Sequence, residues 1–148
     1  MSEVSAYIPK KSVSQLLASF MLLLDGGLLY ITFRTDKLLM FRVIDALGLG
    51  DVTASYRSSV NLVLPAWIVY CLPGALWSAA YILLVDVVMR NHTVKERLVA
   101  ASIIPMIGLL SELLQITGLM PGTFDVIDVV AYTLPYVLYV IVIKTIVK

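Results

Sequence analysis

Acidic and amide side chains gather where two apolar stretches of the sequence meet. Glu112 and Gln115 lie near the end of one stretch, and Asp125 and Asp128 open the next. Glu112 and Gln115 are three residues apart, so they share one face of a helix. Carboxylates accept hydrogen bonds, exchange protons with a substrate, or bind divalent cations through oxygen. Four such groups so close together predict a polar binding or reaction site.

Three further residues are candidates for the same site. Asp25 lies inside the first apolar stretch, Trp77 lies in the second, and Tyr132 follows the two aspartates. Helical periodicity assigns the inward-facing polar residues to stripes on separate helices. On the third apolar stretch, which covers residues 98–119, the stripe is Pro105, Gly108, Glu112 and Gln115. At the start of the fourth stretch and along it, the stripe is Asp125, Asp128, Tyr132, Tyr136 and Tyr139. We expect these stripes to enclose a cleft.

Some polar residues have simpler structural explanations. Asp125 and Asp128 stand at a helix start, where carboxylates cap the helix and suit its dipole. Gly74 and Ser78 are spaced for close helix packing. Asp86 lies near the end of its stretch and is expected to reach water. Packing explains Glu112 least well, because a glutamate inside a long apolar stretch must be protonated, functional or paired with a cation such as Arg34 or Arg57.

The sequence lacks the patterns of common soluble enzymes. It has no glycine-rich phosphate loop and no nucleophile elbow, and its one histidine, His92, stands alone. Three acids without a histidine do not predict a metal site, so we expect neither metal nor cofactor. A net charge of +1 does not indicate nucleic-acid binding. The one cysteine, Cys71, cannot form an internal disulfide.

The composition predicts that these residues are positioned by membrane-spanning helices. The chain of 148 residues is 60% hydrophobic and 14% charged, against about 45–50% and about 25% in soluble domains. Four apolar segments are long enough to cross about 30 Å of hydrocarbon. They cover residues 13–33, 66–89, 98–119 and 126–147. We therefore expect an all-α fold in which residues 1–148 form a single transmembrane domain of four helices.

The connection between the first two spans, Arg34–Leu64, is too long for a simple turn. It mixes apolar and charged residues over about three helical turns before Gly48 and Gly50. This pattern fits an amphipathic helix on the membrane surface, and it fits a short cap packed on the bundle equally well.

The basic residues predict an orientation. With a cytoplasmic N-terminus, seven of the lysines and arginines fall on the cytoplasmic side and four on the other. The positive-inside rule then favours cytoplasmic termini and a polar cleft in the outer half of the bilayer. The first segment is expected to be retained as a span, because it is longer than the core of a signal peptide and no cleavage site follows it.

The stretch Ser111–Asp128, SELLQITGLMPGTFDVID, resembles the VanZ-like family of small bacterial membrane proteins. The matching residues are Glu112, Gln115, Asp125 and Asp128, arranged as E-x-x-Q, a turn and D-x-x-D. The family often has a basic residue ahead of the aspartates, where this chain has Pro121, Gly122 and Thr123. The resemblance implies a multi-pass protein of the bacterial cytoplasmic (inner) membrane, in a family linked to tolerance of antibiotics that act on the cell envelope.

Several functions fit these observations. The first is binding of a membrane lipid or lipid-linked envelope precursor by its head group in the acidic cleft. The alternative is a non-catalytic subunit, whose polar stripes contact a membrane-protein partner or a second copy of the chain. A membrane enzyme using Glu112 and Asp128 as acid and base, or a pathway for protons or ions, would also use these residues. Whether the protein is an enzyme stays open.

Overall fold

The computed structural model describes residues 10–120 and 123–146, and every regular element in that part of the chain is a helix. The expectation of an all-α fold is confirmed for these residues. The helices are α1 (Lys10–Phe33), α2 (Leu39–Ala46), α3 (Gly50–Ser59), α4 (Ala66–Tyr70), α5 (Leu72–Val88), α6 (Val94–Ala101), α7 (Ile103–Ile116) and α8 (Val126–Ile146).

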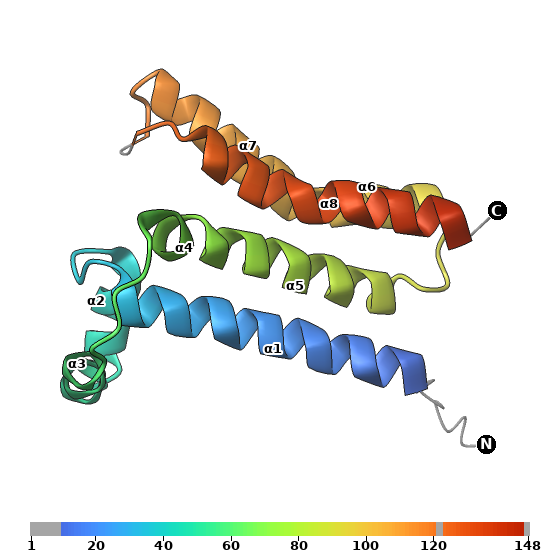
Figure 1. Ribbon diagram of the computed structural model, residues 1–148. Coiled ribbons are helices and arrows are strands. Elements are labelled where there is room, and N and C mark those ends of the chain that lie inside the picture. The colour runs from blue at the N-terminus through green and yellow to red at the C-terminus, as the bar shows by residue number, and fades with distance from the viewer. Residues whose placement is uncertain (1–9, 121–122, 147–148) are drawn as a thin grey trace.

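The long helices lie side by side in layers (Figure 1). Helix α1 forms one outer layer and packs mainly against α5, which occupies the middle with α4. The other outer layer contains α8 and the pair α6 and α7, and α8 packs against both α5 and α7. Helix α5 is therefore the central element of the fold.

Three helical segments are long and apolar enough to cross a membrane, not the predicted four. They are Ser12–Phe33, Val94–Ile116 and Val126–Thr145. The predicted second span is broken at Cys71 into α4, of 5 residues, and α5, of 17 residues. Pro73 explains the break, because proline has no backbone N–H to donate and is tolerated only in the first turn of a helix. The prediction of four spans is thus supported only in part.

The boundaries of the other spans differ slightly from those predicted. Helix α6 begins four residues before residue 98, because Thr93 and Glu96 form a capping box that starts the helix. Helix α7 ends at Ile116, and Gly118 follows with a φ of +71°. Helix α8 begins at Val126 as predicted, whereas residue 147, the predicted end of this span, lies outside the described residues.

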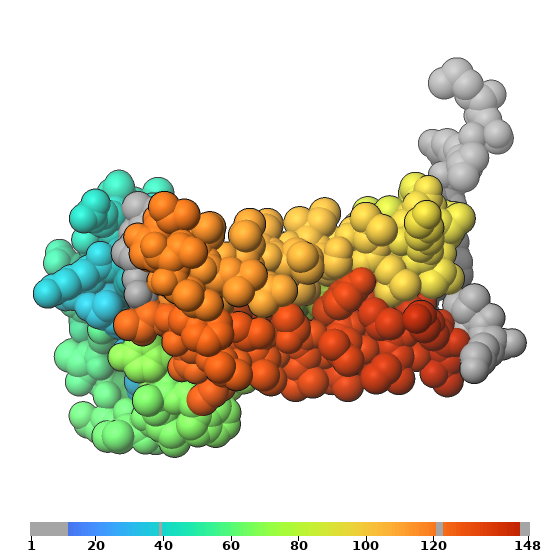
Figure 2. All heavy atoms as spheres, turned by 90° about the horizontal axis from the view of Figure 1, so that it is seen from above, coloured from blue at the N-terminus to red at the C-terminus, as the bar shows by residue number. Residues whose placement is uncertain are grey.

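The first connection contains two short helices. Gly48 has a φ of +73° and ends α2, and α3 begins at Gly50. Helix α3 packs against the last part of α1, and Phe41 of α2 is buried. Figure 2 shows this connection gathered at one end of the molecule. A helix on the membrane surface and a cap packed on the bundle both stay as alternatives for this connection, and the sequence did not predict its second helix.

The contact between α5, α7 and α8 depends on small residues. A Cβ added at Gly74 would lie 2.7 Å from Cε1 of Tyr132, and one added at Gly108 would lie 2.5 Å from its Cγ. The tyrosine ring therefore lies against two helix backbones, which only glycine permits at this distance. Ser78 also donates a hydrogen bond to the Tyr132 carbonyl at 2.9 Å. The expected packing role of Gly74 and Ser78 is confirmed.

A polar cluster joins the helices at the opposite end from α2 and α3. Asp86 of α5 accepts hydrogen bonds from Gln15 of α1 at 2.9 Å and from Tyr139 of α8 at 2.7 Å. It also forms an ion pair with Arg97 of α6. The expectation that Asp86 reaches water is wrong, because only 13% of its side chain is exposed. Its face of α5 points toward donors on three neighbouring helices.

Candidate functional site

A cavity of about 730 Å³ with both polar and apolar lining residues opens at the end of the bundle where α4, the end of α7 and the start of α8 meet. Arg34, the residue that follows α1, completes the wall of the cavity. The lining residues are Arg34, Ala66, Trp67, Tyr70, Cys71, Gln115, Thr123, Asp125, Ile127 and Asp128.

Arg34 supplies the positive charge of the cavity. Its backbone N–H donates to the Tyr30 carbonyl at 3.1 Å, which continues the hydrogen-bond pattern of α1 by one residue. The guanidinium carbon lies 4.7 Å from the centre of the Tyr70 ring and 5.4 Å from that of Tyr30. These cation–π contacts hold the side chain in place. Its Nε is buried and has no hydrogen-bond partner in the described part of the chain.

Asp125, Asp128 and Cys71 form the opposite part of the wall. One carboxylate oxygen of each aspartate and the Cys71 sulfur all lie within 4.8 Å of one another. Asp125 also accepts a hydrogen bond from the Ile127 N–H at 2.8 Å, so it caps α8 as the sequence predicts. The sulfur and the two carboxylate oxygens are close enough together to serve as ligands of one cation.

Glu112 lies behind this wall and does not line the cavity. It is 3% exposed, and one carboxylate oxygen accepts the Asp125 backbone N–H at 3.2 Å. The other oxygen accepts from the Gln115 amide at 3.2 Å. Glu112 therefore joins α7 to the start of α8, and these contacts are with amide groups and not with an arginine. The structure brings all four residues of the predicted polar group together but gives Glu112 a positioning role.

The cavity is not lined by Trp77 or by Tyr132. The Trp77 indole donates a hydrogen bond to the Leu23 carbonyl of α1 at 3.3 Å, and its ring centre is 5.4 Å from that of Tyr30. Tyr132 is held between the backbones of α5 and α7. Both aromatic side chains pack helices together, so neither is in a position to contact a ligand in this cavity.

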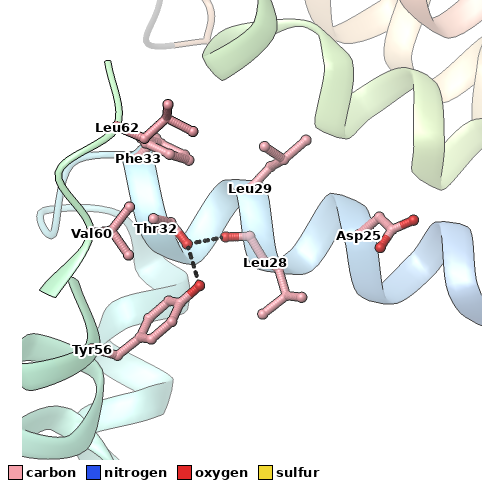
Figure 3. Close-up of a pocket in the computed structure, with 8 residues that line it drawn as sticks. All are labelled: Asp25, Leu28, Leu29, Thr32, Phe33, Tyr56, Val60 and Leu62. Atoms are coloured by element: carbon pink, nitrogen blue, oxygen red, sulfur yellow. Dashed lines mark hydrogen bonds between the residues drawn. The ribbon is translucent and has the colours of Figure 1, made fainter. Parts of the chain in front are cut away.

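Asp25 lies on α1 beside a second, smaller groove of about 400 Å³ (Figure 3). Most of that groove is apolar, and in it the Thr32 hydroxyl donates to the Leu28 carbonyl at 2.6 Å. Asp25 is exposed, and no hydrogen bond or ion pair of its carboxylate occurs among the described residues. Its expected participation in the cleft is therefore not what the structure shows.

The sequence interpretation missed several cavity residues. The periodicity of the second apolar stretch places Tyr70 on its inward face, but it does not predict Trp67 or Cys71 in the site, and Arg34 enters the prediction only as an ion-pair partner of Glu112. The available signal is the position of Arg34, directly after the first span and on the same predicted side as Asp125.

By length and composition, the three apolar segments indicate a multi-pass helical membrane protein. No protein-family model, curated protein or solved structure matches the chain. The resemblance to the VanZ-like family therefore stays a prediction that rests on the polar residues of Ser111–Asp128.

Proposed function

We propose that this chain is a four-pass membrane protein that binds the polar head group of a lipid or a lipid-linked envelope precursor. The observation that carries the proposal is the cavity of about 730 Å³ beside α4 and α8. Its volume lies in the range of about 300–1,000 Å³ that is usual for small-molecule sites. Its walls combine charged groups with the aromatic rings of Trp67 and Tyr70, which suits a ligand that is partly polar and partly apolar.

The contacts at the two ends of the bundle support a fourth membrane crossing by α4 and α5. Gln15, from the start of α1, meets Asp86 near the end of α5, and Asp86 meets Arg97 near the start of α6. Cys71, at the start of α5, lies in the other end of the bundle with Arg34. Helix α5 alone rises about 26 Å over its 17 residues at 1.5 Å per residue, and α4, beyond the break at Cys71, extends the crossing toward the hydrocarbon thickness of about 30 Å.

The proposed orientation places the cavity on the outer side of a bacterial cytoplasmic membrane. The start of α1 and the end of α8 lie at the same end of the molecule (Figure 1), as an even number of crossings requires. The excess of lysine and arginine favours the cytoplasm for that end. The bacterial location follows from the VanZ-like resemblance, which this proposal includes.

The geometry favours binding over catalysis. The acid–base hypothesis required both Glu112 and Asp128 to reach a substrate, but only Asp128 lines the cavity. The carboxylate of Glu112 is occupied by the backbone of Asp125 and the side chain of Gln115. A head group in the cavity would meet Arg34, Gln115 and the aspartates as hydrogen-bonding and charged partners.

Native mass spectrometry of the purified protein, titrated with an envelope lipid extract, tests the proposal. Ala66 lines the cavity and Ala46 of α2 is exposed elsewhere. We expect Ala66→Trp, which fills the cavity, to reduce the population with one retained lipid at least tenfold, and Ala46→Trp to leave it unchanged. Equal retention by both variants and the unchanged protein would show that the cavity is not the binding site.

A second candidate function, a subunit of a larger membrane complex, is favoured by Asp25. Its exposed carboxylate lies 13 residues inside the apolar segment that starts at Ser12, about 20 Å along the helix. A charged carboxylate in contact with lipid has a high free energy, which a positively charged partner would lower. Met21 and Leu28, four residues before and three residues after Asp25, are also exposed, so this side of α1 is open.

A photoreactive residue at position 28, on the same side of α1 as Asp25 and activated in native membranes, tests this second function. A protein product whose own transmembrane helix carries a lysine or arginine, lost in Asp25→Asn, would support it. Products that contain only lipid would contradict it.

A further inference from the structure

The cavity contains opposite charges that do not neutralise each other. Arg34 and the carboxylates of Asp125 and Asp128 line the same space. In the part of the chain that the structure describes, the ion pairs are His92 with Glu96 and Arg97 with Asp86. The Arg34 guanidinium is therefore more than 4 Å from either cavity carboxylate. Opposite charges in a partly apolar site attract each other strongly, so something must hold them apart.

The surroundings of each charge explain the separation. Arg34 lies against the rings of Tyr30 and Tyr70, which fix the guanidinium on the side of α1 and α4. Asp125 is fixed on the opposite side because it caps α8 through the Ile127 N–H. Glu112 accepts the backbone N–H of Asp125 and so positions it further. The positive and negative sides of the cavity are thus built into different helices before any ligand binds.

We propose that the head group bound here is zwitterionic, with a phosphate beside Arg34 and a primary ammonium beside Asp125 and Asp128. This inference rests on the proposed function and names its ligand class. Guanidinium groups bind phosphate oxygens with paired hydrogen bonds. The Nε of Arg34 is buried, so the donors that face a ligand are the terminal nitrogens of the guanidinium, for which no hydrogen bond occurs among the described residues.

The negative side selects an amine with N–H groups. Each aspartate oxygen accepts hydrogen bonds, which a primary ammonium donates and a quaternary ammonium cannot. The amide oxygen of Gln115 adds a neutral acceptor in the same cavity, which Trp67 also lines. A phosphoethanolamine group has both required charges, whether it belongs to a lipid or is free in solution.

Competition between matched lipids, read by native mass spectrometry, tests the inference. Phosphatidylethanolamine and phosphatidylglycerol with the same acyl chains share the phosphate and differ in the ammonium. We expect the protein to prefer phosphatidylethanolamine by about tenfold, the effect of one or two charge-assisted hydrogen bonds. The double variant Asp125→Asn, Asp128→Asn should lose this preference while asparagine keeps the helix cap.

Two single variants complete the design. Arg34→Gln should weaken binding of both lipids, because both use the phosphate. Asp51→Asn removes an exposed carboxylate of α3 outside the cavity and should leave the preference unchanged. Size-exclusion profiles that match the unchanged protein would show that the variants fold.

The outcomes separate the two proposals. If neither lipid binds and soluble phosphoethanolamine binds, the zwitterionic chemistry holds but the ligand is not a lipid. If both lipids bind equally to the unchanged protein and to the double variant, the inference of a zwitterion is overturned while lipid binding stands. If none of the three compounds binds, the proposed function and the inference both fail.

Discussion

At the scale of single residues, Glu112 acts through its neighbours and does not reach the cavity. Its carboxylate accepts the Asp125 N–H and the Gln115 amide, and both groups belong to the cavity wall. A buried N–H that loses its acceptor costs about 1–3 kcal/mol. The same carboxylate therefore stabilises the fold and sets the position of the residues that a ligand would meet.

Substitution of Glu112 separates these effects. Glu112→Gln keeps one carbonyl acceptor, so we expect it to lower the free energy of unfolding by about 1 kcal/mol. Glu112→Ala removes both acceptors and leaves a void, so we expect a loss of about 2–4 kcal/mol. Unfolding in mixed detergent with increasing dodecyl sulfate measures both values. Unfolding curves that coincide for the alanine variant and the unchanged protein would contradict this role.

Sequence patterns predicted the grouping of polar residues better than the role of each residue. The three-residue spacing of Glu112 and Gln115 and the helix start at Asp125 and Asp128 predicted which residues would meet. Spacing does not determine depth within the packed structure. It therefore did not show that Glu112 would be buried behind the wall or that Trp77 would turn toward α1.

At the scale of helices, Asp86 holds the bundle together at the end opposite the cavity. It receives hydrogen bonds or ion-pair contacts from α1, α6 and α8. The side chains of Asp86 and Arg97 are only 13% and 16% exposed, so this pair differs from an ordinary surface salt bridge. Removal of one partner of a buried pair leaves the other charge without compensation.

Asp86→Asn and Asp86→Ala test this role of the cluster. We expect the alanine variant to lose about 3–5 kcal/mol of stability, because the Arg97 charge stays buried without its partner. The asparagine variant should lose less, since it still accepts a hydrogen bond from Tyr139. Glu96→Gln is the control, because its ion pair with His92 is exposed and glutamine preserves the capping box. A smaller effect for Asp86→Ala than for Glu96→Gln would contradict the assignment.

The helices themselves were largely predictable, and the exceptions have local causes. Apolar length and composition located the cores of α1, α7 and α8. Pro73 split the second predicted span, and the capping box at Thr93 started α6 within a segment whose charges had suggested a loop. Helix α3 was missed because its amphipathic signal is short and interrupted by polar residues.

At the scale of the whole molecule, the proposed topology requires α5 to cross the membrane. Three segments meet the criteria of length and composition, while α5 has 17 residues and depends on α4 to reach full length. The number of crossings decides which compartment the cavity faces. It therefore also decides which head groups can enter.

Cysteine labelling from one side of the membrane tests the crossing. With Cys71 replaced by serine, single cysteines at Val63 and His92 flank α4 and α5, and both positions are exposed, Val63 to 93%. We expect an impermeant thiol reagent added to intact cells to label Val63→Cys and to label His92→Cys only after the cells are opened. Labelling of both positions in intact cells would mean that α4 and α5 do not cross.

The central claim, that a lipid head group occupies the cavity, is tested most directly by photo-crosslinking in native membranes. A photoreactive residue replaces Trp67 in the cavity wall, and a matched one replaces Tyr56 beside the groove near Asp25. We predict that mass spectrometry finds a lipid head-group adduct at position 67 and none at position 56. Equal lipid adducts at both positions, or a protein adduct alone at position 67, would contradict the claim.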